Sequence, residues 1–557
     1  MRTPMSERTE SPHDRHGVTR RQVIGIGGAL GLTAIAGLST AAVLARRPPL
    51  TGDELRSAVR LPRAFTVPLP VPTVLEPLSV SDGIDRYEIT QREATVEIVP
   101  GVRTTMWTYD GQFPGPLIES RSGRPITVRH RNELAVPTVV HLHGGRTPAS
   151  SDGYTTDLVL PRTWSDASGR GPRQTGAHDM HGEHMGGGAM QSMQDPRAVV
   201  TTITRDYSYP LEQRPTMLWY HDHRMDFTGP AIWRGLAGMH IIRDDAEDAL
   251  GLPAGARELP LMITDRAFAA DGSLDYPSID PTLRKQPGVR GAFAAGVLGD
   301  VILVNGAPWP VHEVDAARYR LRFLNASNAR QYRLEAVTDD GRRLELVQVG
   351  ADQGLLAAPV SHRSLPIAPA ERYDVVVDFA MVPVGGRVRI INLLGSGRTR
   401  DVMAFRVART VNADDSRIPS VLSTDLPDWS RSHAARVRQF SFRAGQTRGS
   451  NGWFIDGKPF DPSRPDVIAR FGDVEVWQLI ADVHHPVHLH LVGFRVLARG
   501  GKAPLPHDAG LKDTISLRPG ESAEIITRFD GYRGRYLFHC HNAEHEDMGM
   551  MANLEIV

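Results

Sequence analysis

The sequence predicts an all-β protein built from three tandem β-sandwiches. Its 557 residues suffice for about three or four domains of ordinary size. The 53 glycines and 41 prolines are typical of many strands separated by turns. A turn of related sequence, with Asp-Gly or Asn-Gly at its centre, recurs at residues 109–114, 304–309 and 455–460. These domain-sized intervals predict three copies of one structural unit.

Composition excludes several classes of protein. The 64 Lys and Arg residues balance 64 Asp and Glu residues, so no nucleic-acid partner is expected, and no obligate protein partner is indicated. Hydrophobic residues make up 41% of the chain, enough to bury substantial cores. Cys540 is the only cysteine, which excludes an intramolecular disulfide framework and any cysteine-rich metal or iron–sulfur site.

Residues 1–45 are interpreted as a twin-arginine export signal. Arg20 and Arg21 directly precede an apolar run at 23–44 that is rich in glycine and alanine. The run is also just long enough to span a bilayer, so an uncleaved anchor stays open as the alternative. We expect the twin-arginine translocation machinery to recognise this segment, which places the protein in the periplasm, at the cell surface or outside the cell.

The rest of the chain divides at changes in composition. A proline-rich lead-in at 46–75 precedes three predicted domains at 76–245, 250–410 and 430–557. The first contains an insert at 171–196 that is rich in Gly, His and Met, interpreted as a flexible loop. Alternating apolar residues predict half-buried strands, including 125–128, 318–324, 373–379, 387–393 and 522–529.

Paired histidines carry the clearest chemical signal. His-x-His occurs four times among 22 histidines, where chance gives about one. Residues i and i+2 of a strand share a face, so each pair presents two imidazoles in one direction. Imidazole binds Cu, Zn, Fe and Ni. The pairs are His141 and His143, His221 and His223, His488 and His490, and His539 and His541.

The last pair also narrows the choice of metal. Strand alternation places Cys540 on the face opposite His539 and His541. Cys540, His545 and an upstream histidine such as His485, with Met550 as a weak axial ligand, form the His₂Cys and thioether set of an electron-transfer copper centre. Electrons could therefore pass through Cys540 to a second centre held by its two neighbours.

With these motifs, the chain resembles the three-domain multicopper oxidases, and looks closest to the group of bacterial spore-coat laccase, bilirubin oxidase and phenoxazinone synthase. The resemblance runs from the Gly-x-Phe-Pro-Gly-Pro turn at 111–116 to the C-terminus. It implies three cupredoxin-like domains and an enzyme that oxidises phenols or aromatic amines one electron at a time while reducing dioxygen to water.

The resemblance also implies four copper ions per chain: one of type 1, one of type 2 and two of type 3. Type 1 ligands would be His485, Cys540, His545 and Met550. Type 2 ligands would be His141 and His488. Type 3 ligands would be His143, His221, His223, His490, His539 and His541.

Two carboxylates match positions that deliver protons in similar enzymes. Asp152 follows the first His-x-His pair, and Glu546 follows His545. Reduction of dioxygen to water consumes four protons in a buried cavity, so some carboxylate relay is chemically required. The alternative is that Asp152 only caps a turn and Glu546 only orients a histidine.

Because of the Met/His-rich insert, the sequence does not decide which reducing substrate the protein oxidises. Thioethers select Cu(I), so the insert would suit an oxidase of cuprous ions that serves copper tolerance, or it is a solvent-exposed loop without a role in copper handling. A copper-binding protein without turnover is less favoured, since storage needs no cysteine between two centres. The insert's soft ligands are His178, Met180, His181, His184, Met185, Met190 and Met193.

Overall fold

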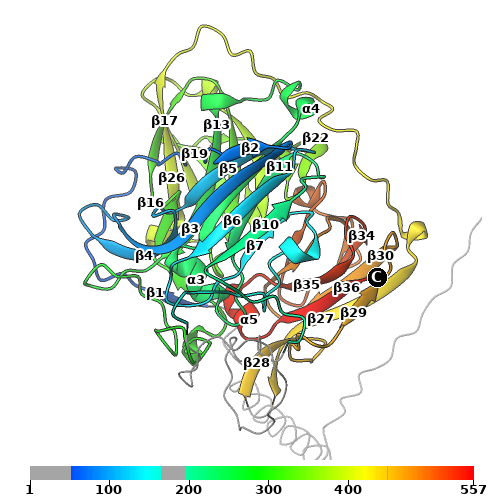
Figure 1. The fold of residues 1–557 in the computed structure, drawn as a ribbon. Coiled ribbons are helices and arrows are strands. Elements are labelled where there is room, and N and C mark those ends of the chain that lie inside the picture. Colours follow the sequence, from blue (N-terminus) through cyan, green and yellow to red (C-terminus); the bar gives the residue numbers. More distant parts are fainter. Residues whose placement is uncertain (1–51, 165–194, 448–449) are drawn as a thin grey trace, which may run out of the picture. The chain divides into compact units, whose positions relative to one another are not determined.

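The computed structural model describes residues 52–557 except 165–194 and 448–449. The predicted export signal and nearly all of the Met/His-rich insert lie outside the described residues. Within these ranges the chain is mostly strands in three consecutive pairs of sheets, so the all-β prediction of three tandem cupredoxin-like sandwiches is confirmed (Figure 1). No helix in the described ranges is both long and apolar enough to cross a bilayer.

The first sandwich packs a mixed sheet against a second sheet that carries the paired histidines. Buried residues such as Ile89, Val128 and Leu142 form its core. The first sheet contains β2 (Ser79–Ser81), β3 (Ile84–Val96), β4 (Thr104–Tyr109), β6 (Ile126–Asn132) and β10 (Thr204–Tyr209). The second contains β5 (Gly115–Arg121), β7 (Val140–His143), β11 (Thr216–Asp222) and β12 (Ala237–Arg243).

The second sandwich has the largest apolar core in the described chain and carries none of the His-x-His pairs. One sheet contains β13 (Glu258–Arg266), β15 (Val301–Val304), β16 (Ala307–Pro308), β18 (Arg318–Asn325), β21 (Leu346–Ala351), β22 (Gly354–His362) and β24 (Arg372–Asp378). The other contains β17 (Val311–Asp315), β19 (Tyr332–Thr338), β20 (Arg343–Leu344), β23 (Leu365–Ile367), β25 (Arg387–Asn392) and β26 (Asp401–Arg409).

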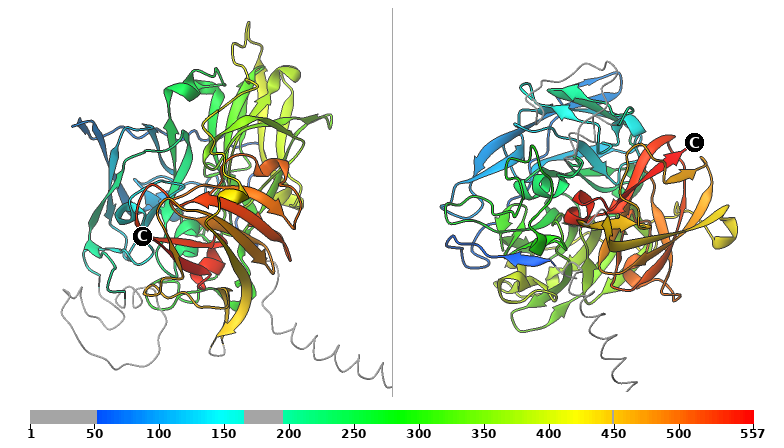
Figure 2. Two further views of the ribbon diagram at one scale, coloured as in Figure 1. Left: turned by 90° about the vertical axis from the view of Figure 1, so that its right-hand side faces the viewer. Right: turned by 90° about the horizontal axis from the view of Figure 1, so that it is seen from below.

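The third sandwich, golden yellow to red in Figures 1 and 2, contains Cys540 in its core. One sheet contains β27 (Arg436–Thr447), β28 (Ser450–Ile455), β30 (Val474–Ala481), β32 (Phe494–Arg499) and β34 (Ser522–Arg528). The other contains β29 (Val467–Ala469), β31 (His485–Leu489), β33 (Thr514–Leu517), β35 (Gly534–Cys540) and β36 (Met551–Ile556). These pairings show which strands pack together, while the numerical domain limits given above stay predictions.

Short elements join the sandwiches near the paired histidines. Helices α3 and α5 contact each other across the first and third sandwiches. The helices are α3 (Thr228–Arg234), α4 (Asp245–Asp248) and α5 (Ala543–Asp547). Two further strand pairs are β1 (Asp53–Leu55) with β14 (Val297–Gly299), and β8 (Val159–Leu160) with β9 (Thr201–Thr202). The 3-10 turns are η1 (Ala149–Ser151), η2 (Gly255–Arg257), η3 (Gly291–Phe293), η4 (Phe379–Met381), η5 (Gly397–Arg400), η6 (Arg431–His433) and η7 (Pro506–Asp508).

The three recurring turns share one backbone conformation. Their Asp-Gly and Asn-Gly residues all have positive φ: 56° and 81° at 110–111, 49° and 82° at 305–306, and 52° and 68° at 456–457. Two consecutive positive values define a type I′ turn, which Asn-Gly and Asp-Gly favour. The predicted strands also coincide, within a few residues, with β6, β18, β24, β25 and β34.

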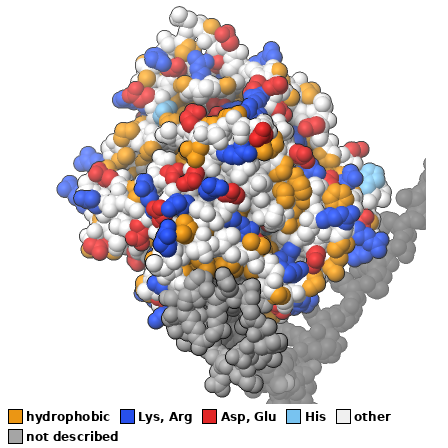
Figure 3. All heavy atoms as spheres, in the orientation of Figure 1, with side chains coloured by type: hydrophobic (Ala, Val, Ile, Leu, Met, Phe, Trp, Pro, Cys, Tyr) orange, Lys and Arg blue, Asp and Glu red, His pale blue; other side chains and the backbone are white. Residues whose placement is uncertain are grey.

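The described part of the proline-rich lead-in lies along the second sandwich before the chain enters the first. β1 pairs in parallel with β14, and Leu69 is buried in the core of the second sandwich. Lys and Arg side chains are interspersed with Asp and Glu on the face drawn in Figure 3. That mixture agrees with the balanced charge of the sequence.

Candidate metal centre

Two neighbouring strands of the first sandwich bring four histidines together. β7 and β11 are antiparallel, and their register sets His141 opposite His221. His143 and His223 each follow one of these by two residues, so each pair turns in one direction. All four rings are buried.

Two strands of the third sandwich supply the other four. β31 and β35 pair with His488 opposite His539 and Val487 opposite Cys540. Val487 and Cys540 belong to the apolar core of the sandwich. His488 and His539 therefore face the opposite side of the sheet, toward the first sandwich, as strand alternation predicts.

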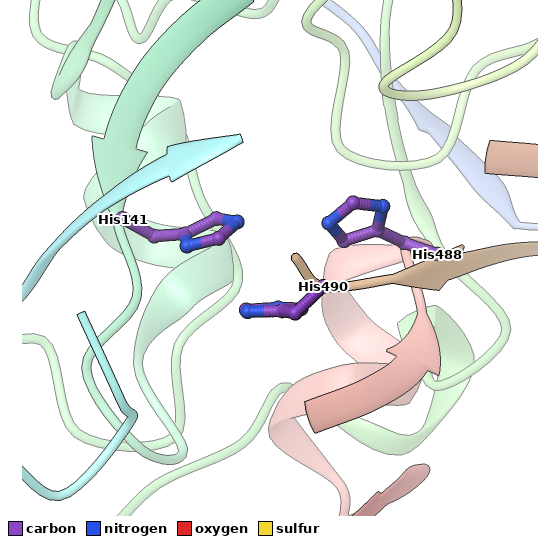
Figure 4. A group of neighbouring side chains, drawn as sticks. All are labelled: His141, His488 and His490. Carbon is purple, nitrogen blue, oxygen red and sulfur yellow. The ribbon is translucent and has the colours of Figure 1, made fainter. Parts of the chain in front are cut away.

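The two sets of histidines meet between the first and third sandwiches. In Figure 4, His141 points from the first sandwich toward His488 and His490 of the third. Potential ligand atoms lie within 4.8 Å of one another in three all-histidine groups. The groups are His141, His488 and His490; His143, His221 and His541; and His223, His490 and His539.

Many of the converging nitrogens have no hydrogen-bond partner among the described residues. The Nε2 atoms of His490 and His223 lie only 3.2 and 3.4 Å from Nε2 of His539. Buried nitrogens that face one another without partners are costly unless a cation binds their lone pairs, so this arrangement fits a metal cluster. The unpartnered atoms are His141 Nε2, His143 Nδ1, His221 Nε2, His488 Nε2 and His541 Nε2.

The opposite ring nitrogens are anchored by the protein. The Nδ1 atoms of His141, His221 and His488 donate to backbone carbonyls at 2.5, 2.8 and 2.9 Å. A proton held at Nδ1 leaves the Nε2 lone pair free for a metal. The site is therefore oriented by hydrogen bonds that lie outside the cluster.

Burial keeps these imidazoles neutral. It lowers the pKa of each ring well below its ordinary value, and neighbouring histidines lower it further. A neutral imidazole is the form that binds metal, so the rings are ready for coordination at neutral pH. This holds for His141, His143, His221, His488 and His490.

Asp152 lies against two of the predicted ligands. Its Oδ2 atom accepts a hydrogen bond of 2.8 Å from Nδ1 of His490, and its backbone carbonyl accepts the one from His141. Its other carboxylate oxygen lies 3.7 Å from Nδ1 of His141 and has no hydrogen-bond partner among the described residues. Burial raises the pKa of Asp152 to about 6, so this carboxyl can exchange a proton near neutral pH.

Glu546 lies on the opposite side of the cluster, on α5. Its carboxylate is 3.3 Å from Nδ1 of His539 and 3.7 Å from Nδ1 of His223, and it accepts a 2.6 Å hydrogen bond from the Thr228 hydroxyl. Burial opposes its ionisation, but the two histidines hold the pKa of Glu546 well below its usual range. The structure thus places both predicted carboxylates beside the histidine cluster.

Sequence reasoning missed a third carboxylate, Asp513. It lies 3.1 Å from Nε2 of His143, and its carbonyl accepts the hydrogen bond from His488. Arg372, which comes from β24 of the second sandwich, donates two 2.6 Å hydrogen bonds to it. Burial opposes ionisation, yet the guanidinium holds the pKa of Asp513 below its usual range. No sequence motif links Arg372 to Asp513, so only the fold reveals this pair.

The second predicted centre lies within the third sandwich. Sγ of Cys540 is 3.5 Å from Nδ1 of His485 and 3.6 Å from Nδ1 of His545, and the two nitrogens are 3.1 Å apart. Met550 is fully buried in the same core cluster, and its backbone carbonyl accepts a hydrogen bond from the Cys540 N–H. One thiol and two imidazoles thus converge as an electron-transfer copper centre requires.

Burial raises the pKa of the Cys540 thiol well above its usual value. A coordinating metal reverses this preference, because a metal-bound thiol loses its proton outright. The donor set of one sulfur and two nitrogens fits copper.

The surroundings of this centre were also missed from sequence. Trp453 on β28 stacks on the His545 ring at 3.6 Å between centroids. Asp482 accepts a 2.9 Å hydrogen bond from Nε2 of His485. Asn542 caps α5 by accepting from the N–H groups of Glu544 and His545. An acidic residue three positions before His485 was the available signal for Asp482.

Comparison with known proteins agrees with this geometry. Family models described as multicopper oxidase match residues 90–165 and 428–557. A laccase from Bacillus stratosphericus is 34% identical over 544 residues, covering 88% of this chain and 99% of the relative. The chain belongs to the multicopper oxidase family. A bilirubin oxidase from Albifimbria verrucaria is 33% identical over 515 residues, which cover 88% of this chain and 80% of the relative.

Solved structures of multicopper oxidases share the fold. A laccase from Pediococcus acidilactici superimposes with a TM-score of 0.73 at 28% identity, covering 90% of this chain and 96% of that one. The McoA multicopper oxidase from Aquifex aeolicus superimposes with a TM-score of 0.70 at 28% identity, covering 88% of this chain and 99% of that one. This multicopper oxidase therefore uses copper cofactors and couples oxidation of a substrate to reduction of dioxygen.

Proposed function

We propose that this multicopper oxidase is an exported laccase-like enzyme that takes single electrons from phenols or aromatic amines and reduces dioxygen to water. It would hold four copper ions, with the type 1, type 2 and type 3 ligands assigned as the resemblance implies. The observation that carries the proposal is Cys540, whose sulfur faces His485 and His545 while its two chain neighbours reach the histidine cluster.

This placement sets up a short covalent route for electrons. Bound copper would supply one-electron chemistry at Cys540 and the site for dioxygen at the histidine cluster. His539 and His541 flank Cys540 directly in the chain, and both lie in the histidine groups between the sandwiches. The donor can therefore react at the third sandwich while dioxygen stays in the buried interface.

Asp152 and Glu546 would manage the protons of oxygen reduction. The Asp152 carboxyl, with its raised pKa, can hold and release a proton beside His490. Glu546 stays ionised between His539 and His223 and contacts the Thr228 hydroxyl, which can pass a proton to its carboxylate. General acid–base groups within hydrogen-bond reach are the requirement for such a relay.

A cuprous oxidase that serves copper tolerance is the second candidate. It is supported by the soft ligands of the Met/His-rich insert, since thioethers select Cu(I). Both candidates share the same oxygen chemistry and differ only in the reducing substrate.

The test is the visible spectrum of the copper-loaded protein, combined with oxygen uptake on a simple phenol and on Cu(I). A thiolate-to-copper band with oxygen uptake supports the oxidase, and Cys540→Ser should abolish both. Bound copper without the band or oxygen uptake would instead indicate a storage protein.

A variant of the insert separates the two substrates. Met180, Met185, Met190 and Met193 are replaced together by Leu, and Met381→Leu, an exposed methionine of the second sandwich, is the matched control. Loss of Cu(I) oxidation alone assigns copper handling to the insert. Retention of both activities in the variant favours phenol oxidation.

Export is a separate part of the proposal and rests on Arg20 and Arg21 before the apolar run. Replacing both arginines by lysine should leave the protein inside the cytoplasm, as cell fractionation would show. Unchanged export of that variant would contradict the twin-arginine route.

A further inference from the structure

A cavity of about 320 Å³ lies between the second and third sandwiches. The second sandwich contributes β19, β23 and the segment before β24, and the third contributes β32, β33 and η7. None of the described residues that line it is a predicted copper ligand. Clefts at domain interfaces are common sites for small molecules, and this volume lies at the lower end of their usual range. The cavity therefore suits a small organic ligand.

Two arginines give the cavity a positive charge. Arg333 and Arg518 both line it, and both are exposed. Their backbone N–H groups donate to the side chains of Asn392 and Glu521, but among the described residues neither guanidinium forms a hydrogen bond or an ion pair. A guanidinium carries five N–H donors and no acceptor, so both groups are free to bind an anion.

The other two charged side chains that line the cavity already have partners. Arg499 donates two 2.7 Å hydrogen bonds to Asp508 and lies 3.3 Å from Glu521. The carboxylate of Glu371 lies 3.2 Å from the ammonium group of Lys512, which is fully buried. The charge that remains on the cavity wall is therefore positive, and it attracts anions.

The cavity also offers a polar atom without a partner and an apolar surface. Nδ1 of His484 is buried and has no hydrogen-bond partner among the described residues. A buried polar atom of this kind calls for a ligand or an ordered water. The apolar surface comes from Pro366, Ile367, Leu394 and Pro519. A ligand that matches this wall carries a negative charge on a hydrocarbon body.

We propose that this cavity binds a small aromatic carboxylate. Its carboxylate group would accept hydrogen bonds from Arg333 and Arg518, since the planar guanidinium matches the geometry of a carboxylate, and its ring would lie against the apolar surface. The bound molecule would contact the second and third sandwiches together. Binding involves no turnover, so the proposal holds whichever reducing substrate the enzyme oxidises.

The test is isothermal titration calorimetry of the copper-loaded protein with para-bromobenzoate, which is neither a phenol nor an amine. The neutral probe para-bromobenzamide has nearly the same shape and no charge. We expect the carboxylate to bind on the order of tenfold more tightly than the amide, because hydrogen bonds between charged groups are stronger than neutral ones. Equal affinity for the two probes would overturn the proposal.

A pair of double variants makes the result specific. Arg333→Gln/Arg518→Gln removes both charges at exposed positions and should weaken binding of para-bromobenzoate by about tenfold or more. Arg436→Gln/Arg470→Gln removes the same charge from two exposed arginines of the third sandwich that do not line the cavity. Its affinity should stay within about twofold of the parent, because salt screens distant charges. Equal losses in both double variants would show that only net charge matters, which contradicts a defined site.

Two further measurements fix the place and the class of the ligand. Carboxylates can also bind to copper, so a crystal soaked with para-bromobenzoate is used to locate the bromine by its anomalous X-ray scattering. A bromine peak in the cavity supports the proposal, and a peak only at a copper centre overturns it. Inorganic phosphate carries the charge without the ring and should bind more weakly. Phosphate binding as tight as that of para-bromobenzoate would contradict the aromatic class.

Discussion

At the scale of single residues, the histidine cluster is prepared by hydrogen bonds on its outer side. His141, His221 and His488 each commit one nitrogen to a carbonyl and leave the other without a partner among the described residues. This division fixes both tautomer and ring direction before any metal binds. The side chains beside the cluster that can still exchange a proton are therefore the carboxylates.

Asp152→Asn tests the proton relay. Asparagine can still accept the hydrogen bond from Nδ1 of His490 through its carbonyl oxygen, but it cannot exchange a proton. We expect steady-state oxygen uptake to fall by roughly a hundredfold, while anaerobic reduction of the blue band stays unchanged.

The same variant also tests the alternative role of Asp152. Oxygen uptake is measured in light and heavy water, and a larger solvent isotope effect is expected in the variant. Full activity of Asp152→Asn would show that Asp152 only orients His490.

At the scale of elements, alternation along two strands separates the two copper centres. On β31, His485 and His488 are three residues apart and face opposite sides, one toward Cys540 and one toward the interface. On β35, Cys540 turns into the sandwich core while His539 turns out. A shift of register by one residue would exchange these faces and destroy both sites.

A second element-scale feature is a buried ionic network on the parallel strands β13 and β18. Glu258 accepts hydrogen bonds from Arg322 and Arg243, at 2.5 and 2.9 Å. Burial opposes its ionisation, but Arg322, Arg320 and Arg243 together lower the pKa of Glu258 to about 2. These hydrogen bonds involve no predicted copper ligand, so the effect of the network on stability can be measured separately.

Glu258→Gln should lower the free energy of unfolding by about 3 kcal/mol at neutral pH, because it leaves buried guanidinium charge without its partner. The folded pKa of Glu258 lies below its unfolded value of about 4.3, so the stabilisation is present above that pH and is lost as the pH falls toward 2. The difference in melting temperature between parent and variant should therefore shrink over this range.

The matched control is Glu313→Gln, which removes an exposed carboxylate on the edge strand β17. We expect it to change stability by less than about 1 kcal/mol at any pH, as is usual for surface ion pairs. If the difference in melting temperature between the parent and Glu258→Gln did not change with pH, the lowered pKa of Glu258 would be contradicted.

At the scale of the whole molecule, the predicted oxygen site belongs to no single domain. The first and third sandwiches each provide two His-x-His pairs, and Arg372 of the second sandwich holds Asp513 beside them. Helices α3 and α5 meet next to the site, where Asp547 accepts the N–H groups of Thr228 and Gly229. Copper binding should consequently stabilise the assembled domains together.

Copper loading should raise the melting temperature of the apoprotein by roughly 5–10 °C, because a ligand that binds only the folded state adds its binding free energy to stability. The double variant His221→Gln/His541→Gln, which draws one ligand from each sandwich, should lose most of this gain. Calorimetry of the apo and loaded forms measures the shift.

His312→Gln is the control for the copper experiment, because His312 lies on β17 of the second sandwich, outside the histidine groups. It should show the same copper-dependent shift as the parent. An equal shift in the double variant would mean that copper stabilises the protein without joining the first and third sandwiches.

The sequence alone determined the fold class and the residues that meet at the two centres. His-x-His pairs and the neighbours of Cys540 could be interpreted because the alternation of a strand is a local property, independent of the rest of the fold. The Asp-Gly and Asn-Gly turns were predictable for the same reason, since their conformation depends on the two residues themselves.

Only the tertiary structure decided which carboxylates and aromatic rings surround the histidines. Arg372 and Asp513 are 141 residues apart, and Trp453 on β28 stacks on His545 of helix α5. Asp482 is close to His485 in sequence, but its side chain is only partly exposed because of how distant segments pack. Likewise, Trp453 covers His545 because β28 packs against the segment before β14. Contacts between distant segments depend on the packing of whole domains, which no local pattern encodes.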